Sequence, residues 1–503
     1  MASMNYRRCL VKLPCYSSQF PLFNLPLQVI SNAVLCTSFS TTANHKADRN
    51  GPPKKGTSSL RITKKAPVKE KGKPPAQGER KALRKRIVLS NTNALEVELP
   101  EYDNTLIREL LSKSRPTPIK NRSPTKQRGK DEGSETGENT PAVSAPVPAS
   151  KLIGSVIGLS DKVIDGLRAT NAFKVTQSWR LFRQPGILIR EESRILTELM
   201  VQAQENKQTL RLVIDGAKGT GKSMLLIHAI STGLVRDWIV INIPEAQEVT
   251  NAVTDYAPIP DSDLWCQNNL IAELLSKVAQ ANSVLLDSMP VTQIHKKLPV
   301  KIDSSTSIYR LCELGAREPD ISWPFFLAFW AEITAQGRPP ILMCLDGLSH
   351  ILQNSLYLKP DLSHIHAQDL ALIRHFTDYL SGTRTLSNGG AFLAATSRSH
   401  SPVSPTLELS VRRWEERMQN LEESKIDPYE KKYDTRSEKV LSNVEFLKLG
   451  GLSKDETKGL LEYWAKSGLF RSKVDDATVV EKWVLSGHGN AAEIQRSSLW
   501  MRV

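Results

Sequence analysis

The stretch that decides the fold is residues 209–230, which read TLRLVIDGAKGTGKSMLLIHAI. Residues 210–215 form a short apolar run with β-branched members, a composition typical of a buried strand. The run enters GAKGTGKS, a full match to the pattern G-x-x-x-x-G-K-[ST], and an apolar segment without helix breakers follows. We therefore predict a strand, a glycine loop (residues 216–223) and a helix in direct succession.

The residue types of the glycine loop are those that bind a polyphosphate. Glycines let the backbone curl closely, so that several N–H groups point at the anion, and the following helix adds the positive end of its dipole. Lys222 is expected to reach the β- and γ-phosphates, and the Ser223 hydroxyl to take a position on Mg²⁺. The expected phosphate-binding residues are Gly216, Lys218, Gly219, Thr220, Gly221, Lys222, Ser223 and Met224.

Two later apolar runs end in polar residues that fit the same site. Residues 341–346 (ILMCLD) predict a strand that places Asp346 beside the loop, where its carboxylate would hold Mg²⁺ through water. Residues 391–398 (AFLAATSR) predict another strand, whose Thr396 or Arg398 would sense the γ-phosphate. For Arg398 the alternative is an exposed arginine in a loop.

A third group of candidates lies upstream of the first strand. In folds of this kind the segment before that strand often packs beside the base of the nucleotide. Pro185, Ile187 and Ile189 are therefore candidates for the base pocket. Packing in the core explains these three residues equally well.

The rest of the pattern from residue 151 onward predicts an α/β body with a parallel sheet flanked by helices. Two more strands are expected at 238–243 (WIVINI) and 444–449. Ser453 and Glu456 form a capping box, and with a short helix from Ala491 they predict a small helical lid at 451–503. Helical spacing covers residues 104–113, 160–168, 191–205, 263–281, 305–315, 323–335 and 411–422.

The positive charge of the chain is concentrated in one part. The first 150 residues hold 26 Lys and Arg against 12 Asp and Glu, and the rest of the 503-residue chain holds 41 of each sign. Residues 46–150 are rich in Lys, Arg, Pro, Gly and Ser, which predicts a mostly disordered basic arm, with one helix at 104–113. We expect this arm to bind RNA phosphates, a merely solvated tail being the alternative.

The first 45 residues predict import into mitochondria. They contain Arg7, Arg8 and Lys12, many Ser and Thr, and no acidic residue before Asp48, as in a transit peptide. Prolines break the apolar core that a secretory signal would need. The sequence contains no run of eighteen apolar residues, so we predict no membrane span. The six cysteines form no C-x-x-C pair, so they support neither a zinc site nor a disulfide framework, and a reducing compartment fits. Cys344 is expected in the core.

These motifs together resemble P-loop ATPases of the AAA-like or signalling (STAND) branch. With the leader and the basic arm, the chain from 151 to 503 resembles the death-associated protein 3 family of the mitochondrial small ribosomal subunit. The resemblance is carried by the glycine loop, residues 238–246 (WIVINIPEA), 258–265 (PIPDSDLW), 345–347 (LDG) and 452–464.

The resemblance implies a structural ribosomal protein that binds a purine nucleotide and contacts small-subunit rRNA, other mitochondrial ribosomal proteins and the neighbourhood of the large subunit. Family members bind GTP, but this chain has no N-K-x-D motif, which would recognise guanine. The bound nucleotide can therefore be GTP, GDP or ATP, and we expect Mg²⁺ to accompany it. AAA-type ATPases place a glutamate after the strand aspartate, where this chain has Gly347. We therefore expect weak or absent hydrolysis and a structural or switching nucleotide; the alternative is an AAA-like motor or a STAND-type signalling ATPase.

Overall fold

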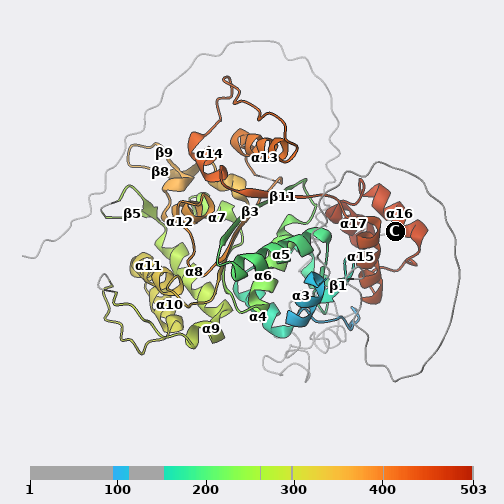
Figure 1. The fold of residues 1–503 in the computed structure, drawn as a ribbon, viewed down its shortest axis with the longest axis horizontal. Helices are drawn as coiled ribbons and strands as arrows, with labels where there is room; N and C mark the ends of the chain where they lie inside the picture. Colours follow the sequence, from blue (N-terminus) through green and yellow to red (C-terminus); the bar gives the residue numbers. More distant parts are fainter. Residues whose placement is uncertain (1–93, 113–151, 261, 296–297, 400, 501–503) are drawn as a thin grey trace, which may run out of the picture. The chain divides into compact units, whose positions relative to one another are not determined.

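The computed structural model describes residues 94–112, 152–260, 262–295, 298–399 and 401–500. The predicted transit peptide (1–45) and most of the predicted basic arm (46–150) lie outside the described residues, so those two predictions stay predictions. The described part is a mixed α/β structure built on one parallel sheet (Figure 1).

Five strands form this sheet, in the order β11-β3-β10-β7-β4. Every neighbouring pair is parallel. Their bounds are β3 Thr209–Gly216, β4 Ile239–Ile243, β7 Ile341–Asp346, β10 Gly390–Ala395 and β11 Glu445–Leu449. All five strands were predicted, because short apolar runs buried on both faces are typical of a parallel sheet.

The side chains of each strand alternate between two hydrophobic cores. On β7, Ile341, Met343 and Leu345 pack into one core, and Leu342 and Cys344 pack into the other. This alternation follows from the two-residue period of a strand. Cys344 is fully buried, which confirms its prediction as a core residue.

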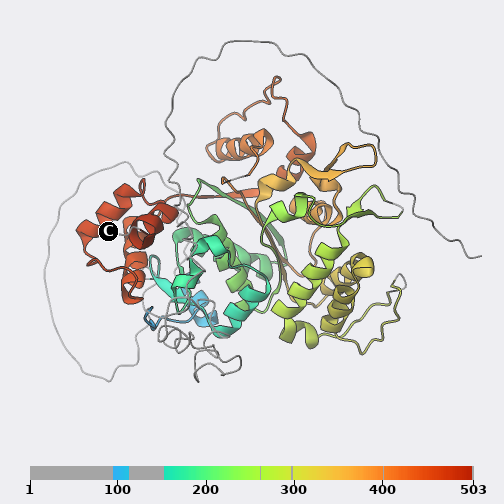
Figure 2. The ribbon, with the colours of Figure 1, turned by 180° about the vertical axis from the view of Figure 1, so that it is seen from behind.

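Helices cover both faces of the sheet (Figures 1 and 2). One face carries α3 Asn104–Leu111, α4 Asp161–Ala169, α5 Glu191–Glu205 and α6 Lys222–Val235. The other carries α7 Ala246–Thr250, α8 Asn268–Ala281, α9 Ser283–Asp287, α10 Ile308–Arg317, α11 Ser322–Ile333, α12 Ala371–Leu380, α13 Pro405–Met418 and α14 Thr435–Leu441. The C-terminal part forms α15 Lys454–Lys466, α16 Asp476–Leu485, α17 Ala491–Gln495 and the π-helical turn η7 Arg496–Trp500. Among the helices of the described ranges, none has the length and hydropathy that crossing a membrane requires.

Shorter elements lie outside the sheet and were not predicted, because segments of two to five residues carry too little periodicity. Three antiparallel strand pairs join β1 Val156–Gly158 with β2 Gly186–Leu188, β5 Ala257–Pro258 with β6 Trp265–Cys266, and β8 Asn354–Leu358 with β9 His364–His366. The 3₁₀ turns are η2 Val175–Gln177, η3 Trp179–Leu181, η4 Pro319–Ile321, η5 Leu348–Ile351 and η6 Ala367–Asp369.

Two helices begin five or six residues from the predicted start, for local reasons. The helix predicted at 263–281 begins at Asn268, because Trp265 and Cys266 pair in β6. The helix predicted at 411–422 begins at Pro405, whose fixed φ suits a first helical position, and Ser404 caps it by accepting a hydrogen bond from the Leu407 N–H.

Residues 94–112, which belong to the predicted arm, pack onto the body. The Tyr102 hydroxyl lies 2.7 Å from Thr232 Oγ1 on α6, and the Tyr102 N–H donates to the Gly158 carbonyl at the end of β1. Helix α3 contributes three aliphatic side chains to the core that it shares with α5 and α6: Leu106, Ile107 and Leu110. The helix predicted at 104–113 is thus confirmed, and its amphipathic face explains why this piece is ordered.

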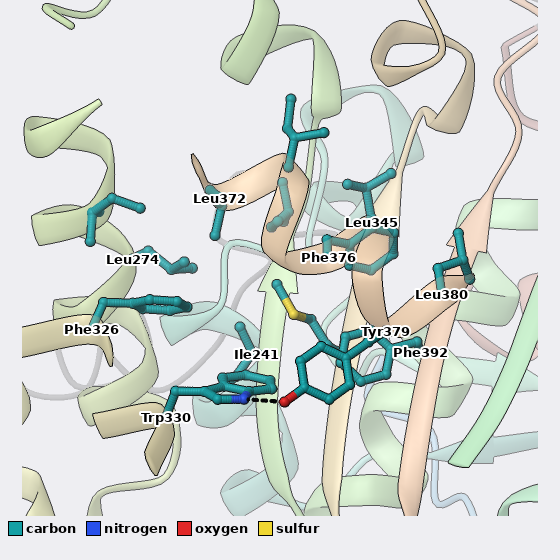
Figure 3. Close-up of a cluster of buried hydrophobic side chains, with 14 of the residues drawn as sticks. Ile241, Leu274, Phe326, Trp330, Leu345, Leu372, Phe376, Tyr379, Leu380 and Phe392 are labelled. Atoms are coloured by element: carbon teal, nitrogen blue, oxygen red, sulfur yellow. Dashed lines mark hydrogen bonds between the residues drawn. The ribbon is translucent and has the colours of Figure 1, made fainter. Parts of the chain in front are cut away.

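The core between the sheet and the helices of its second face is rich in aromatic side chains (Figure 3). The Trp330 indole N–H donates to the Tyr379 hydroxyl at 2.8 Å, and the Tyr379 ring stacks on Phe392 of β10. His375 lies among Phe326, Trp330 and Tyr379, and its Nε2 finds no hydrogen-bond partner in the described part of the chain. Burial, aided by Arg384, lowers the pKa of His375 from 6.5 to about 3.

We predict that the burial of His375 makes the folded protein less stable in acid. Because its folded pKa lies below the unfolded value, the unfolded chain binds more protons between about pH 6.5 and pH 3, and the free energy of unfolding falls as the pH falls through that range. We expect His375→Phe to flatten this dependence by about 1.4 kcal/mol per pH unit. Denaturant unfolding from pH 7 to pH 4.5 measures the slope. The matched control, His364→Phe at an exposed position, is expected to keep the wild-type slope; an unchanged slope in His375→Phe would contradict the prediction.

Candidate functional site

The glycine loop joins the end of β3 to the start of α6, as predicted. Gly219 and Gly221 have φ angles of +81° and +102°, a left-handed conformation that favours glycine. Gly221 is the N-cap of α6, so the first turn of that helix follows directly from the loop. The loop therefore curls back at the carboxyl edge of the sheet, with the helix N-terminus behind it.

Lys222 is buried inside the curl of the loop. Its Nζ donates to the Gly216 carbonyl at 2.7 Å and to the Ala217 carbonyl at 2.8 Å. Burial lowers the pKa of Lys222, and the carboxylates of Asp215 and Asp346 oppose this shift. The ammonium is thus held among backbone oxygens rather than in solvent.

Asp346 is the point at which the predicted metal residues meet. It ends β7, its side chain is 9% exposed, and its Oδ2 accepts a hydrogen bond from Ser223 Oγ at 2.6 Å. The structure therefore brings Ser223 and Asp346 together, as the sequence predicted. The same Oδ2 also lies 2.6 Å from the Nζ of Lys174, a residue that was not among the candidates predicted from the sequence.

Thr396 and Arg398, the candidates for a γ-phosphate sensor, are both bound to Asp215. The Thr396 hydroxyl donates to Asp215 Oδ1 at 2.7 Å, and the Arg398 guanidinium lies 3.3 Å from each carboxylate oxygen. Asp215 is buried directly before the loop. The two residues therefore support the base of the loop and also line the cavity beside it.

A buried arginine ties the loop to the C-terminal helices. The Arg190 guanidinium donates to the Thr220 carbonyl at 3.0 Å and to the Gly450 carbonyl at 3.1 Å, where β11 ends. It also lies 3.7 Å from Glu456, the acidic member of the capping box of α15. The capping box predicted from Ser453 and Glu456 is confirmed, but its link to the loop depends on a residue far away in the sequence.

The start of α17 lies directly against the glycine loop. Asn490 Nδ2 donates to the Lys218 carbonyl at 2.8 Å, and the Ala492 N–H donates to the Gly219 carbonyl at 3.0 Å. A Cβ atom on Gly219 would lie 2.5 Å from Asn490 Oδ1 and 2.8 Å from Ala492 Cβ. The helical nature of the predicted lid is confirmed, and these contacts place its last helix at the site.

A cavity of about 890 Å³ opens over the loop, a size that suits a small organic ligand. Its polar lining includes the glycine loop, Asp346, Glu245 and Lys174. Its apolar lining comes from both the body and the C-terminal helices: Trp179, Phe182, Ile187, Leu452, Leu460, Tyr463 and Trp464. The cavity thus has a polar part at the glycine loop and an apolar part formed by the body and the C-terminal helices.

The three base-pocket candidates differ in their positions. Ile187, on β2, lines the cavity. Ile189 is fully buried in the core, and the Pro185 carbonyl accepts a hydrogen bond from the Leu159 N–H. Aromatic residues that the sequence did not single out lie beside Ile187, among them Phe182, whose ring stacks on that of Tyr463 at 5.1 Å.

Two further polar residues of the cavity have only weak signals in the sequence. Glu245 follows β4, and the carboxyl ends of parallel strands share one edge, which was its only signal. His350 lies in η5, close behind Asp346, and its burial lowers its pKa, with Glu245 opposing. Both groups line the cavity, and the strands that precede them, β4 and β7, are neighbours in the sheet.

The family model described as mitochondrial ribosomal death-associated protein 3 matches residues 187–497, which include the glycine loop, the sheet and the C-terminal helices. The chain belongs to this family. The resemblance to the death-associated protein 3 family is therefore confirmed, and the family's mitochondrial location agrees with the predicted leader.

Three relatives to which the chain is similar share one name. The chain is 40% identical to the small ribosomal subunit protein mS29 of Neurospora crassa over 99% of both chains. It is 25% identical to the protein of the same name from Schizosaccharomyces pombe, over 67% of this chain and 70% of the relative. The relative of that name from Bos taurus is 20% identical over 45% of this chain.

The contact between the glycine loop and α17 generates a prediction with a matched control. Gly219→Ala and Gly337→Ala both place a side chain at a φ near +80°, but a Cβ at Gly337 would meet nothing within 4 Å. We expect Gly337→Ala to cost about 1–2 kcal/mol from the left-handed backbone alone. Gly219→Ala should cost more and should expose residues 451–500 to protease, because Asn490 and Ala492 must move. Denaturant unfolding and limited proteolysis measure both effects. Equal stability and equal protease sensitivity of the two variants would show that the close contact of Gly219 with Asn490 and Ala492 does not stabilise the protein.

Proposed function

We propose that this chain is a structural protein of the small ribosomal subunit in the mitochondrial matrix and holds a purine nucleotide on its glycine loop. The observation that carries the ribosomal part is the 40% identity over 99% of both chains to a protein named as a small ribosomal subunit component. Such a protein is expected to lie among rRNA and other ribosomal proteins, with contacts near the large subunit as a further expectation. The excess of basic over acidic residues in the first 150 positions supports RNA binding by the arm.

The nucleotide part is supported by the geometry of the loop. Left-handed glycines at 219 and 221 allow close approach of a ligand to the backbone, and the N-terminus of α6 supplies a positive dipole end. Lys222 brings its charge into the same curl. The strand order β11-β3-β10-β7-β4, with the loop after β3 and an aspartate at the end of β7, fits the P-loop NTPase class.

The residues present also fit a magnesium ion carried by the nucleotide. The Ser223 hydroxyl and the Asp346 carboxylate are hard oxygen donors that already lie within hydrogen-bonding distance of each other. No cluster of three or more His, Cys, Asp or Glu side chains suited to a metal occurs among the described residues. Mg²⁺ would therefore need phosphate oxygens to complete its shell. When bound, it would neutralise phosphate charge.

A structural role for the nucleotide agrees with the residues around Asp346. Gly347 occupies the position of the glutamate of AAA-type ATPases, and its φ of +94° disfavours any other residue there. Glu245 lines the cavity, but Lys174 lies 3.8 Å from its carboxylate and engages it. We propose that hydrolysis is weak or absent and that binding itself stabilises the fold. A purine fits the aromatic part of the cavity; the choice between guanine and adenine stays open.

Sedimentation of mitochondrial lysate tests the ribosomal proposal. We expect the protein to migrate with small-subunit rRNA after moderate salt washing. Because phosphate contacts weaken with salt, truncating residues 46–93 should lower the salt concentration at which the protein dissociates. Migration as a discrete hexamer free of rRNA would instead favour the AAA-like motor, and a monomer free of rRNA the signalling ATPase.

A ligand-induced stability shift tests the nucleotide proposal. At a hundred times its dissociation constant, Mg·GTP or Mg·ATP should raise the free energy of unfolding of the wild-type protein by about 2.7 kcal/mol. Lys222→Ala should lose this increase. Since Lys222 also bonds to loop carbonyls, each variant is compared with itself, with and without nucleotide. Lys162→Ala, which breaks only a surface ion pair with Asp237, is the control and should keep the shift. A wild-type protein that responds to neither nucleotide contradicts the proposal.

A further inference from the structure

Lys174 occupies an unusual place in the site, since it brings a fixed positive charge to the predicted metal residues. Its Nζ lies 2.6 Å from Asp346 Oδ2, the same oxygen that accepts the Ser223 hydroxyl. The Lys174 side chain is 20% exposed and that of Asp346 is 9% exposed, so this ion pair is shielded from solvent. It therefore differs from the ordinary ion pairs of a protein surface, which solvent and salt weaken.

A second carboxylate lies on the other side of the ammonium. Glu245, which follows β4, is 3.8 Å from Lys174 Nζ. The ends of β4 and β7 are neighbours in the sheet, which places the two carboxylates around one cation. Lys174 thus neutralises negative charge where a divalent cation would otherwise be attracted.

The backbone of Lys174 is held by a compact turn, so its position does not depend on the flexible side chain alone. Its N–H donates to Gln177 Oε1 at 3.2 Å, and its carbonyl accepts from the Gln177 N–H. Gln177 Oε1 also accepts the Trp179 indole N–H at 2.6 Å. Trp179 is buried and packs edge-on against Phe173. The turn that carries Lys174 therefore also carries an aromatic wall of the cavity.

We propose that Lys174 is a built-in counter-cation that competes with Mg²⁺ for Asp346. An oxygen that holds an ammonium at 2.6 Å must release it before it can join the shell of a metal ion, and Mg²⁺ gives up its own water reluctantly. A lysine ammonium also serves as a point charge for phosphate. The site then takes a nucleotide with little dependence on Mg²⁺. The part of this inference that concerns the nucleotide rests on the proposed function.

Direct binding of Mn²⁺ to the nucleotide-free, full-length protein tests the competition itself. Electron paramagnetic resonance counts free Mn²⁺ in a titration. We expect little binding by the wild-type protein and one added site in Lys174→Met, which frees Asp346 and Glu245. Combining Lys174→Met with Asp346→Asn should remove that site. Lys162→Met, the same change in a surface ion pair, is the matched control and should behave as wild type.

A second variant guards against misfolding. Lys174→Gln keeps a hydrogen-bond donor toward Asp346 but removes the charge, and it is used if Lys174→Met melts early. Added Mn²⁺ binding in either folded variant supports the proposal. The proposal is overturned if the wild-type protein already binds Mn²⁺ as the variants do, or if no folded variant gains a site.

Isothermal titration calorimetry with GTP and with ATP gives the second readout. We expect the wild-type dissociation constant to change by about threefold or less between Mg²⁺ and EDTA, and that of Lys174→Met by about tenfold or more, within the usual range of coupling between two ligands. Equal ratios in the two proteins would overturn the inference. If neither nucleotide binds the wild-type protein at all, the proposed nucleotide function fails. The Mn²⁺ titration then still tests whether Lys174 competes with a divalent cation for Asp346.

Discussion

The site depends on one constraint, the common edge at which five parallel strands end. Ala395, the last residue of β10, pairs with Ile214 on one side and with Asp346 on the other, so the end of β7 comes level with the start of the glycine loop. Leu345 pairs with Ile243, which sets Glu245 beside the same edge. Because side chains alternate along a strand, a slip of one residue would turn Asp346 to the other face. The meeting of Ser223 with Asp346 is therefore a consequence of sheet register.

The second constraint is the close approach of distant backbone segments around the glycine loop. The Gly219 carbonyl bonds to Ala492, and the Thr220 carbonyl bonds to Arg190. The loop is therefore supported by α17 and by the start of α5. In this family member the glycine loop is thus part of the packing between the body and the C-terminal helices. A ligand on the loop would act on that packing.

Much of the fold could be predicted because its signals are local. The five strands, the glycine loop and Asp346 can each be recognised from a pattern of fewer than ten residues. The capping box of α15 can be recognised from four residues. The failures have local causes as well: the short antiparallel strands are below the length that periodicity can detect, and α13 begins at Pro405, upstream of its predicted start. The residues that complete the site, Lys174, Arg190 and Asn490, had no such signal.

The sequence by itself determined the class of fold and the place of the glycine loop, because apolar periodicity and the glycine pattern act over one element at a time. The tertiary structure alone decided which charges meet. Lys174 lies 172 positions from Asp346 in the chain, and Asn490 lies 272 positions from Lys218. Contacts of that separation follow from the order of the strands and the packing of helices on the sheet. No short stretch of the chain contains that information.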